Sequence, residues 1–207
     1  MIDYPPYRIE SPRLVLRCWN PEDAPLFHEA IISSIDHLRP YMPFIAKEPL
    51  KLEDRIELLR SFRSSFDSSD NYIYGIFDKN EKKVLGSTGL HKKIGKYGFE
   101  VGYCIVRDEC NKGIATDSTK MLLEVGFNVK EIDRIELYCN PNNTYSRRIP
   151  EKLGFTCEGV RKRINTTFPG EFRDSMVWVL FRNEYLEHKP TIKIEAFDAI
   201  GRSITLE

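Results

Sequence analysis

Short segments in which apolar and polar residues alternate recur along this chain, and such alternation is typical of half-buried β-strands. Residues 13–19, "RLVLRCW", form the first of them. Three more, at residues 71–78, 84–94 and 99–106, are separated by short turns rich in polar residues or glycine. Strands joined by such short turns pair as antiparallel neighbours, so these three segments predict a meander.

Apolar residues at helical spacing predict helices between and after these strands. A helix is expected just after Asn20, which is a good N-cap and is followed by Pro21 and two acidic residues. Residues 52–66 and 116–130 show the same spacing. Residues 38–49 contain three prolines among apolar and aromatic residues, which predicts a structured loop in place of a regular element.

The second half of the chain predicts alternating strands and helices. Residues 134–140 alternate as a strand, and residues 142–155 predict a short helix that ends at Gly154. Pro150 lies inside this helix and removes one backbone hydrogen bond, so we expect a kink or a late helix start. A strand beginning near residue 172 and a hairpin at residues 191–207 complete the order. Antiparallel strands followed by alternating units predict a mixed α/β fold.

Length and charge limit the kinds of partner. A chain of 207 residues suits one domain, or one domain with an appendage. Lys+Arg and Asp+Glu are both 31, and this zero net charge argues against nucleic acid as a direct partner. We see no signal-peptide core and no run near the roughly 18 apolar residues that span a bilayer. A cytoplasmic protein without a membrane partner is therefore expected.

The cysteines and histidines argue against a metal site or a disulfide framework. The five cysteines are odd in number and lack a C-x-x-C pair, and the four histidines are scattered. The simplest interpretation is a reduced protein that uses cysteines as small core residues and binds no metal.

The stretch "RDECNKGIATDSTK", residues 107–120, predicts an anion site. A strand leads through a loop into a helix that begins near Ala115, so free backbone N–H groups and the helix dipole meet there. Gly113 lets the backbone approach a ligand closely, and Lys112 either adds charge or is simply solvated. A nucleotide-binding loop would end in Gly-Lys-Ser/Thr, which is missing. By itself the stretch fits a purely structural turn equally well.

A second stretch, "NPNNTYSRRIPEKLGFTCEGVRKR" at residues 140–163, changes this balance. Together the two resemble the GNAT acyltransferase family, and most closely the branch that acetylates the N-terminal amines of ribosomal proteins. Residues 110–115 resemble the family's R/Q-x-x-G-x-G/A loop. The second block matches at Asn143, Ser146, Glu151-Lys152-Leu153-Gly154-Phe155 and Glu158-Gly159. The resemblance implies a GNAT domain over residues 9–187, with a central, twisted, mostly antiparallel sheet flanked by helices.

Residues 188–207 lie outside the resemblance and form a C-terminal extension. Its apolar residues need a cover, which is either the domain's own sheet or a second subunit. We expect a homodimer contact there.

The resemblance further implies that the bound anion is the pyrophosphate of coenzyme A, with acetyl-CoA as cosubstrate and no metal. Cys110 stands where the family prefers Arg or Gln, and Asn111 where this branch often has Gly. Both contribute mainly backbone N–H groups, so binding should survive. Lys152 belongs to a basic cluster that either contacts the 3′-phosphate or is a solvated face. The expected cofactor-binding residues are Cys104, Ile105, Val106, Cys110, Asn111, Lys112, Gly113, Ile114, Ala115, Thr116, Asn143 and Lys152.

Acetyl transfer to an amine needs a base, a polarised carbonyl and a leaving thiolate. Glu100 is the expected base and shares a strand face with Gly102 and Cys104, although a solvated glutamate is the plainer alternative. His91 is the second candidate. Many family members use a tyrosine as acid where this chain has Pro150. Ser146, which matches the serine of the ribosomal-protein branch, is the expected acid unless it only caps its helix.

The acceptor site is expected opposite the cofactor, with substrate-binding residues Tyr41, Met42, Phe44 and His91. The resemblance implies an N-acetyltransferase that acts in a ternary complex on a primary amine, and we expect a protein N-terminal α-amine. Two alternatives stay open. One is a small-molecule acetyltransferase for polyamines or aminoglycosides, whose substrates favour an acidic cleft. The other is a non-catalytic coenzyme A-binding module.

Overall fold

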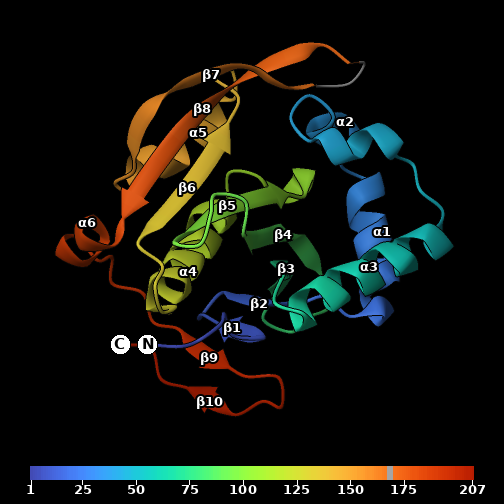
Figure 1. Ribbon diagram of the computed structural model, residues 1–207. Helices are drawn as coiled ribbons and strands as arrows, with labels where there is room; N and C mark the ends of the chain where they lie inside the picture. The colour runs from blue at the N-terminus through green and yellow to red at the C-terminus, as the bar shows by residue number, and fades with distance from the viewer. Residues whose placement is uncertain (167–169) are drawn as a thin grey trace.

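The protein is described here by a computed structural model that covers residues 1–166 and 170–207. In this described part the strands form one ten-stranded sheet in the order β10-β9-β1-β2-β3-β4-β5-β6-β8-β7 (Figure 1). Neighbouring strands are antiparallel except for β5 and β6, which run parallel. The predicted mixed α/β fold with a mostly antiparallel sheet is confirmed.

The elements follow the predicted order closely. The strands are β1 Arg8–Glu10, β2 Leu14–Cys18, β3 Asn71–Asp78, β4 Val84–His91, β5 Gly98–Ile105, β6 Arg134–Cys139, β7 Thr156–Thr166, β8 Phe172–Phe181, β9 Glu195–Phe197 and β10 Ser203–Ile204. The α-helices are α1 Ala24–Ile32, α2 Ile35–Leu38, α3 Leu52–Asp67, α4 Ile114–Asn128, α5 Thr144–Lys152 and α6 Arg182–Glu187. Short 3₁₀ helices are η1 Pro21–Asp23, η2 Pro43–Lys47 and η3 Arg107–Glu109.

Successive residues of a strand point to opposite faces of the sheet, and apolar side chains pack on both faces. In β2, Leu14 and Leu16 belong to the apolar cluster that includes Met121 and Leu122 of α4. Val15, between them, belongs to the opposite cluster, which includes residues of α1 and α3. Helix α4 therefore covers one face of the sheet, and α1 and α3 cover the other (Figure 1).

The parallel strands β5 and β6 diverge after a short paired stretch. Their ladder runs from Gly98 with Arg134 to Val101 with Leu137, and β5 continues to Ile105 beyond it (Figure 1). The Val106 N–H donates to Leu85 O on the β4 side. Because alternate residues direct their backbone groups to opposite edges, those of Tyr103 and Ile105 face the gap between β5 and β6.

The C-terminal extension forms the predicted hairpin and continues the protein's own sheet. Strand β9 pairs with β1 in register from Arg8 with Phe197 to Glu10 with Glu195, and β10 pairs with β9. The extension thus joins the domain's own sheet, which was one of the two expected arrangements. A contact with a second copy stays a prediction.

One prediction about local structure was wrong. Residues 38–49 are not a loop throughout, since η2 lies within them and α2 ends at Leu38. The strand predicted to begin near residue 172 is β8, and helix α6, which was missed, begins directly after it; the Glu184 carboxylate accepts from the Phe181 N–H and so fixes this helix start. Strand β1, which has only three residues, was missed because three residues show no period.

Candidate active site

The gap between β5 and β6 opens into a cavity of about 830 Å³. Strands β4, β5 and β6 form its floor, and the segment from α2 to η2 and the β7–β8 hairpin line its other sides. The predicted residues Tyr41, Met42, Phe44, His91, Glu100, Cys104, Asn143 and Ser146 all line this one cavity. The fold thus brings together side chains from four separate parts of the chain.

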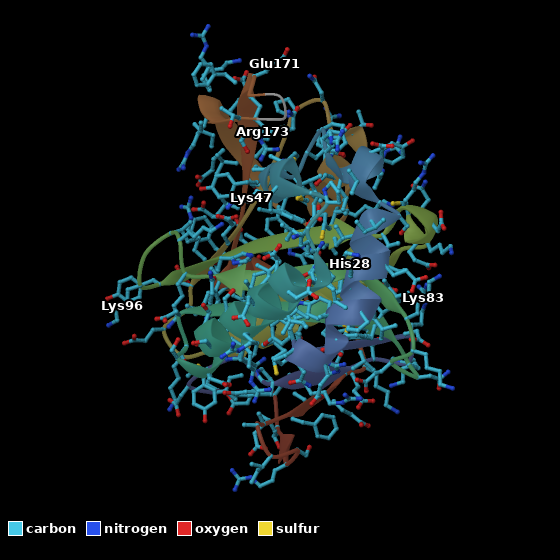
Figure 2. The ribbon with its side chains drawn as sticks, turned by 90° about the vertical axis from the view of Figure 1, so that its right-hand side faces the viewer. His28, Lys47, Lys83, Lys96, Glu171 and Arg173 are labelled. Atoms are coloured by element: carbon cyan, nitrogen blue, oxygen red, sulfur yellow. The ribbon has the colours of Figure 1, made fainter. Side chains whose placement is uncertain are left out.

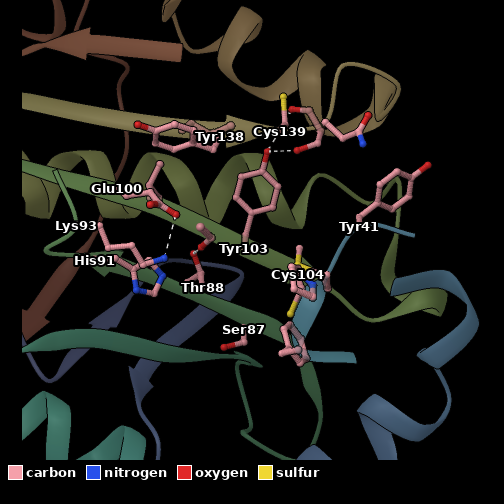
Figure 3. A pocket seen from close by; sticks show the side chains of 18 of the residues that line it. Tyr41, Ser87, Thr88, His91, Lys93, Glu100, Tyr103, Cys104, Tyr138 and Cys139 are labelled. Carbon is pink, nitrogen blue, oxygen red and sulfur yellow. Dashed lines mark hydrogen bonds and ion pairs between the residues drawn. The ribbon is translucent and has the colours of Figure 1, made fainter. Parts of the chain in front are cut away.

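Glu100 and His91 are direct cross-strand neighbours on the cavity floor (Figure 3). Glu100 Oε1 lies 3.4 Å from the Nζ of Lys93, which also lines the cavity. The expected alternation along β5 is confirmed, since Val101 and Tyr103 pack in the cluster under α4 and Cys104 belongs to the opposite cluster. Lys93 was missed, because it follows the end of β4 and no periodic pattern indicates its direction.

His91 is held as a neutral imidazole. Its Nδ1 lies 2.9 Å from the Asn71 amide oxygen, so Nδ1 carries the proton and Nε2 keeps its lone pair. Burial lowers the pKa of His91 to about 4, with a smaller contribution from Lys93. A Cβ on Gly89 or Gly102 would approach Nε2 to 3.2 or 3.3 Å. The two glycines therefore make room for the ring over the strands.

Helix α5 begins where the sequence predicts. The Asn143 side-chain oxygen accepts from the Ser146 N–H at 3.1 Å, so Asn143 is the N-cap. Its amide oxygen is thereby engaged, which leaves its amide NH₂ as the group that can donate to a ligand. Gly154, with φ 80°, ends the helix in the left-handed conformation as expected.

The hydroxyl of Tyr103 accounts for the proline inside α5. In an uninterrupted helix the N–H of residue 150 would donate to the Ser146 carbonyl, and proline has no N–H. The Tyr103 hydroxyl lies 3.2 Å from that carbonyl oxygen and donates to it, and it also lies 3.0 Å from Ser146 Oγ. Tyr103 thus satisfies the carbonyl that Pro150 leaves free and holds the Ser146 hydroxyl at the cavity. Burial raises the pKa of Tyr103, so the phenol stays protonated.

The Tyr103–Pro150 relation predicts a coupling in stability. Tyr103→Phe leaves the Ser146 carbonyl without a donor and is expected to cost about 1 kcal/mol in unfolding free energy. In a Pro150→Ala background the restored N–H supplies the missing donor, so the same substitution should cost clearly less. Urea unfolding of the four variants measures this coupling. Strict additivity of the two substitutions would contradict it.

The anion-binding loop has free N–H groups at the start of α4. The first hydrogen bond of the helix runs from Asp117 N to Gly113 O, so the N–H groups of Gly113 to Thr116 have no acceptor within the helix. Gly113 is the N-cap with φ 81°, a left-handed conformation that favours glycine. These free donors fit a phosphate group.

The loop is fixed by a residue that sequence reasoning missed. Arg13, just before β2, donates to the Lys112 carbonyl at 2.8 Å and pairs with Asp117 at 2.7 Å. Lys112 Nζ lies 3.1 Å from Glu109. The Cys110 thiol contacts the His37 Nε2 at 3.3 Å and the Val106 carbonyl. The side chains at 110 and 112 are thus engaged within the protein, which fits a loop whose ligand contacts come from its backbone.

The predicted basic cluster is divided in the structure; its members are Arg147, Arg148, Lys152, Arg161, Lys162 and Arg163. Lys152 is the exposed last residue of α5, and Arg147 on the same helix pairs with Glu151 at 3.0 Å. Arg161 of β7 instead lies over the Tyr138 ring, and both line the cavity. A single basic surface for a 3′-phosphate is therefore not formed by all of these residues, and Lys152 stays a prediction.

The fold and the cavity agree with what comparisons with known proteins show. A family model described as acetyltransferase (GNAT) domain matches residues 13–156. The chain belongs to the GNAT acetyltransferase family. As a GNAT enzyme it is an acetyl-CoA-dependent N-acetyltransferase, and the resemblance seen in the sequence is confirmed.

Similar proteins include enzymes named as N-acetyltransferases of ribosomal proteins. The chain is 23% identical over 181 residues to the [ribosomal protein uS5]-alanine N-acetyltransferase of Escherichia coli, covering 85% of this chain and 91% of that protein. It is 27% identical to the uncharacterised N-acetyltransferase YoaA of Bacillus subtilis, covering 75% of this chain and 86% of YoaA. The structure of the ribosomal L7/L12 α-N-protein acetyltransferase RimL with coenzyme A has a TM-score of 0.76 at 18% identity, covering 84% and 97% of the two chains.

Coenzyme A fits two features of this GNAT chain: the free N–H groups at the start of α4, and the open backbone edge of β5 beside the gap. Among the described residues no group of three or more His, Cys, Asp or Glu side chains could hold a metal ion. In the same residues no helix is long and apolar enough to cross a membrane.

Proposed function

We propose that this GNAT enzyme transfers the acetyl group of acetyl-CoA to the N-terminal α-amine of a protein, directly and within a ternary complex. The observation that carries the proposal is the shared cavity: Glu100 on its floor and Ser146 on α5 face one space that joins the coenzyme gap to the aromatic segment at Tyr41 to Phe44. Direct transfer needs no nucleophile on the enzyme, and the two free thiols on this cavity fit that scheme. Burial raises the pKa of both Cys104 and Cys139 to about 11, so neither is a ready thiolate.

Each proposed role follows from position. Glu100 takes the proton of the acceptor ammonium, through water, because an amine without a lone pair cannot attack. The backbone N–H of Ile105, which faces the gap, stabilises the oxyanion that develops on the thioester. The Ser146 hydroxyl, which otherwise donates to the Tyr103 oxygen, gives its proton to the departing sulfur and takes up the proton that the amine nitrogen loses as the amide forms. Acetyl-CoA supplies the activated acyl group.

Charge on the cavity wall supports an α-amine over a polyamine. Of the described residues that line it, Lys93, Arg161 and Arg173 are cationic, and Glu100 and Glu136 are carboxylates. Both carboxylates are already paired, Glu100 with Lys93 and Glu136 with Arg134. Such a lining repels a polycation. A shorter stretch of the chain, 80 residues, is 32% identical to the spermidine N(1)-acetyltransferase of Escherichia coli, which keeps polyamines as the alternative to be tested.

Thermal unfolding with acetyl-CoA tests the cofactor. At 100 times its Kd the ligand should stabilise the protein by about 2.7 kcal/mol, whereas ATP should not. Gly113→Ala strains a φ of 81° and places a methyl group 3.6 Å from the Arg13 guanidinium that holds the loop, so we expect roughly tenfold weaker binding. Gly95→Ala is the matched control, since Gly95 also has a positive φ and lies in the turn before β5, with open space around it. Equal loss in both variants would contradict a ligand site at Gly113.

Acceptor class is tested with wild-type enzyme and acetyl-CoA. Peptides with a free α-amine, the same peptides with a blocked α-amine and one lysine, and spermidine are compared by mass spectrometry. Acetylation confined to the free α-amine supports the proposal. The pKa of an α-amine, near 7.7–8.0, lies far below that of lysine, so a mild base suffices. Preferred turnover of spermidine would replace the protein terminus with a small-molecule acceptor.

A further inference from the structure

Two cationic side chains on the cavity wall, Arg161 and Arg173, form no ion pair among the described residues; Arg161 lies over the Tyr138 ring, whereas Arg173 has no aromatic partner of this kind. Arg173, near the start of β8, donates from Nη1 to the Tyr41 carbonyl at 2.5 Å. Its Nε is buried and has no hydrogen-bond partner within the described residues. No carboxylate among the described residues pairs with its guanidinium. The adjacent Asp174 pairs with Lys162 instead. A guanidinium stays protonated, so Arg173 is an uncompensated positive charge.

The position of Arg173 is on the acceptor side of the cavity. The β7–β8 hairpin carries it over α2 and toward the segment that includes η2 (Figures 1 and 2). The Tyr41 contact joins the hairpin to the segment expected to bind the acceptor. The anion cradle of the coenzyme is elsewhere, at Gly113, where the start of α4 supplies its own donors. The charge of Arg173 is therefore available to the acceptor.

Arg173 is half-buried, and a partly desolvated cation without a partner gains stability from a ligand that supplies the anion. A guanidinium binds a carboxylate through charge-assisted hydrogen bonds, and Arg173 has Nη2 left for this, since Nη1 donates to the Tyr41 carbonyl and Nε is covered by the protein. The carboxylates that line the cavity are already paired with Lys93 and Arg134.

We infer that Arg173 is the receptor for a carboxylate on the acceptor, so that the preferred substrate is an amine followed closely by an acidic group. The inference rests on the proposed function and narrows it. In a peptide the carboxylate belongs to an Asp or Glu side chain behind the N-terminus. In a free amino acid it is the α-carboxylate.

The test is a comparison of matched peptides with the full-length protein and acetyl-CoA. Peptides with Glu or Gln at the second, third or fourth position are acetylated, and kcat/KM is measured for each. Wild-type enzyme should favour one Glu peptide over its Gln partner by roughly 10- to 100-fold, as for a charge-assisted hydrogen bond. Arg173→Met should abolish this preference by lowering only the Glu value. Arg173→Lys should retain part of it.

Lys162→Met is the control, because Lys162 lies on the same hairpin, carries the same charge and has a side chain that is 76% exposed. It should keep the full preference. Equal rates of wild type on Glu and Gln peptides would overturn the inference and leave the proposed function intact. Equal loss on both peptides in Arg173→Met, or an increase only in the KM of acetyl-CoA, would also overturn it.

Free glutamate and glutamine distinguish the source of the carboxylate. Turnover of free amino acids in preference to peptides, lost in Arg173→Met, would support the receptor and contradict a protein terminus as acceptor. Absence of acetylation of every amine, despite acetyl-CoA binding, would overturn the proposed function and the inference with it.

Discussion

Replacing Glu100 with glutamine is expected to lower kcat/KM for the acceptor by about 10²- to 10⁴-fold, the usual contribution of a general base. Glutamine keeps the size of the side chain but cannot take the proton of an ammonium. Because Glu100 lies on the cavity floor away from the anion cradle, acetyl-CoA binding should be unchanged. Steady-state kinetics with saturating acetyl-CoA measures the first effect, and thermal shift measures the second.

A matched substitution separates this effect from the loss of a surface charge. Glu158 also pairs with a cation, Arg134 at 2.8 Å, but its side chain is 43% exposed and it is not among the residues that line the cavity. Glu158→Gln should therefore retain activity. Near wild-type activity in Glu100→Gln, together with a large loss in His91→Gln, would make His91 the base, because its Nε2 lone pair is free to accept a proton.

Replacing Glu48 with glutamine is expected to lower the free energy of unfolding by about 3–5 kcal/mol. Glu48 and Arg55 form an ion pair at 2.8 Å, and their side chains are 1% and 0% exposed. Without the carboxylate the Arg55 charge stays buried and unpaired. An unpaired buried charge lowers the free energy of unfolding more than most single substitutions do. Glu48 also accepts from the Leu50 N–H at 2.9 Å and follows η2 directly. The substitution should therefore also make η2, in the segment expected to bind the acceptor, less ordered. The melting temperature should decrease by about 10 °C.

An exposed ion pair on α3, the helix that carries Arg55, is the control for the buried pair. Arg60 and Glu57 of α3 lie 2.8 Å apart, and their side chains are 63% and 66% exposed. Glu57→Gln should change stability by less than about 1 kcal/mol, because water and salt screen such a pair. Similar losses in Glu48→Gln and Glu57→Gln would show that the buried pair has no special weight.

Features that depend on neighbours in sequence were predictable from the chain. Alternation located β2 to β6 because each strand exposes successive residues to opposite faces of the sheet. A glycine before a helical pattern located the anion loop, since only the local backbone decides whether N–H groups are free there. The same local reasoning placed the end of α5 at Gly154 and put Glu100, Gly102 and Cys104 on one face.

Contacts between distant segments were not predictable. The sequence indicated a proline inside α5 but gave no reason for it, because the compensating hydroxyl of Tyr103 comes from β5, 43 residues before Ser146 in the chain. Alternation alone puts Tyr103 on the face opposite Glu100, which was the one available signal. The pairing of Lys93 with Glu100 depends on the direction in which the chain leaves β4.

The contacts of Arg173 were also not predictable from the sequence. Its sequence neighbourhood, "EFRDS", reads as an ordinary strand start, and Asp174 next to it would suggest a paired charge. Only the fold directs Asp174 to Lys162 and Arg173 to the Tyr41 carbonyl, 132 positions away. The sequence by itself determined the family, most of the order of elements and the chemistry available. The tertiary structure decided which of those groups share the cavity, because strand register and the reach of the β7–β8 hairpin set distances that no local pattern contains.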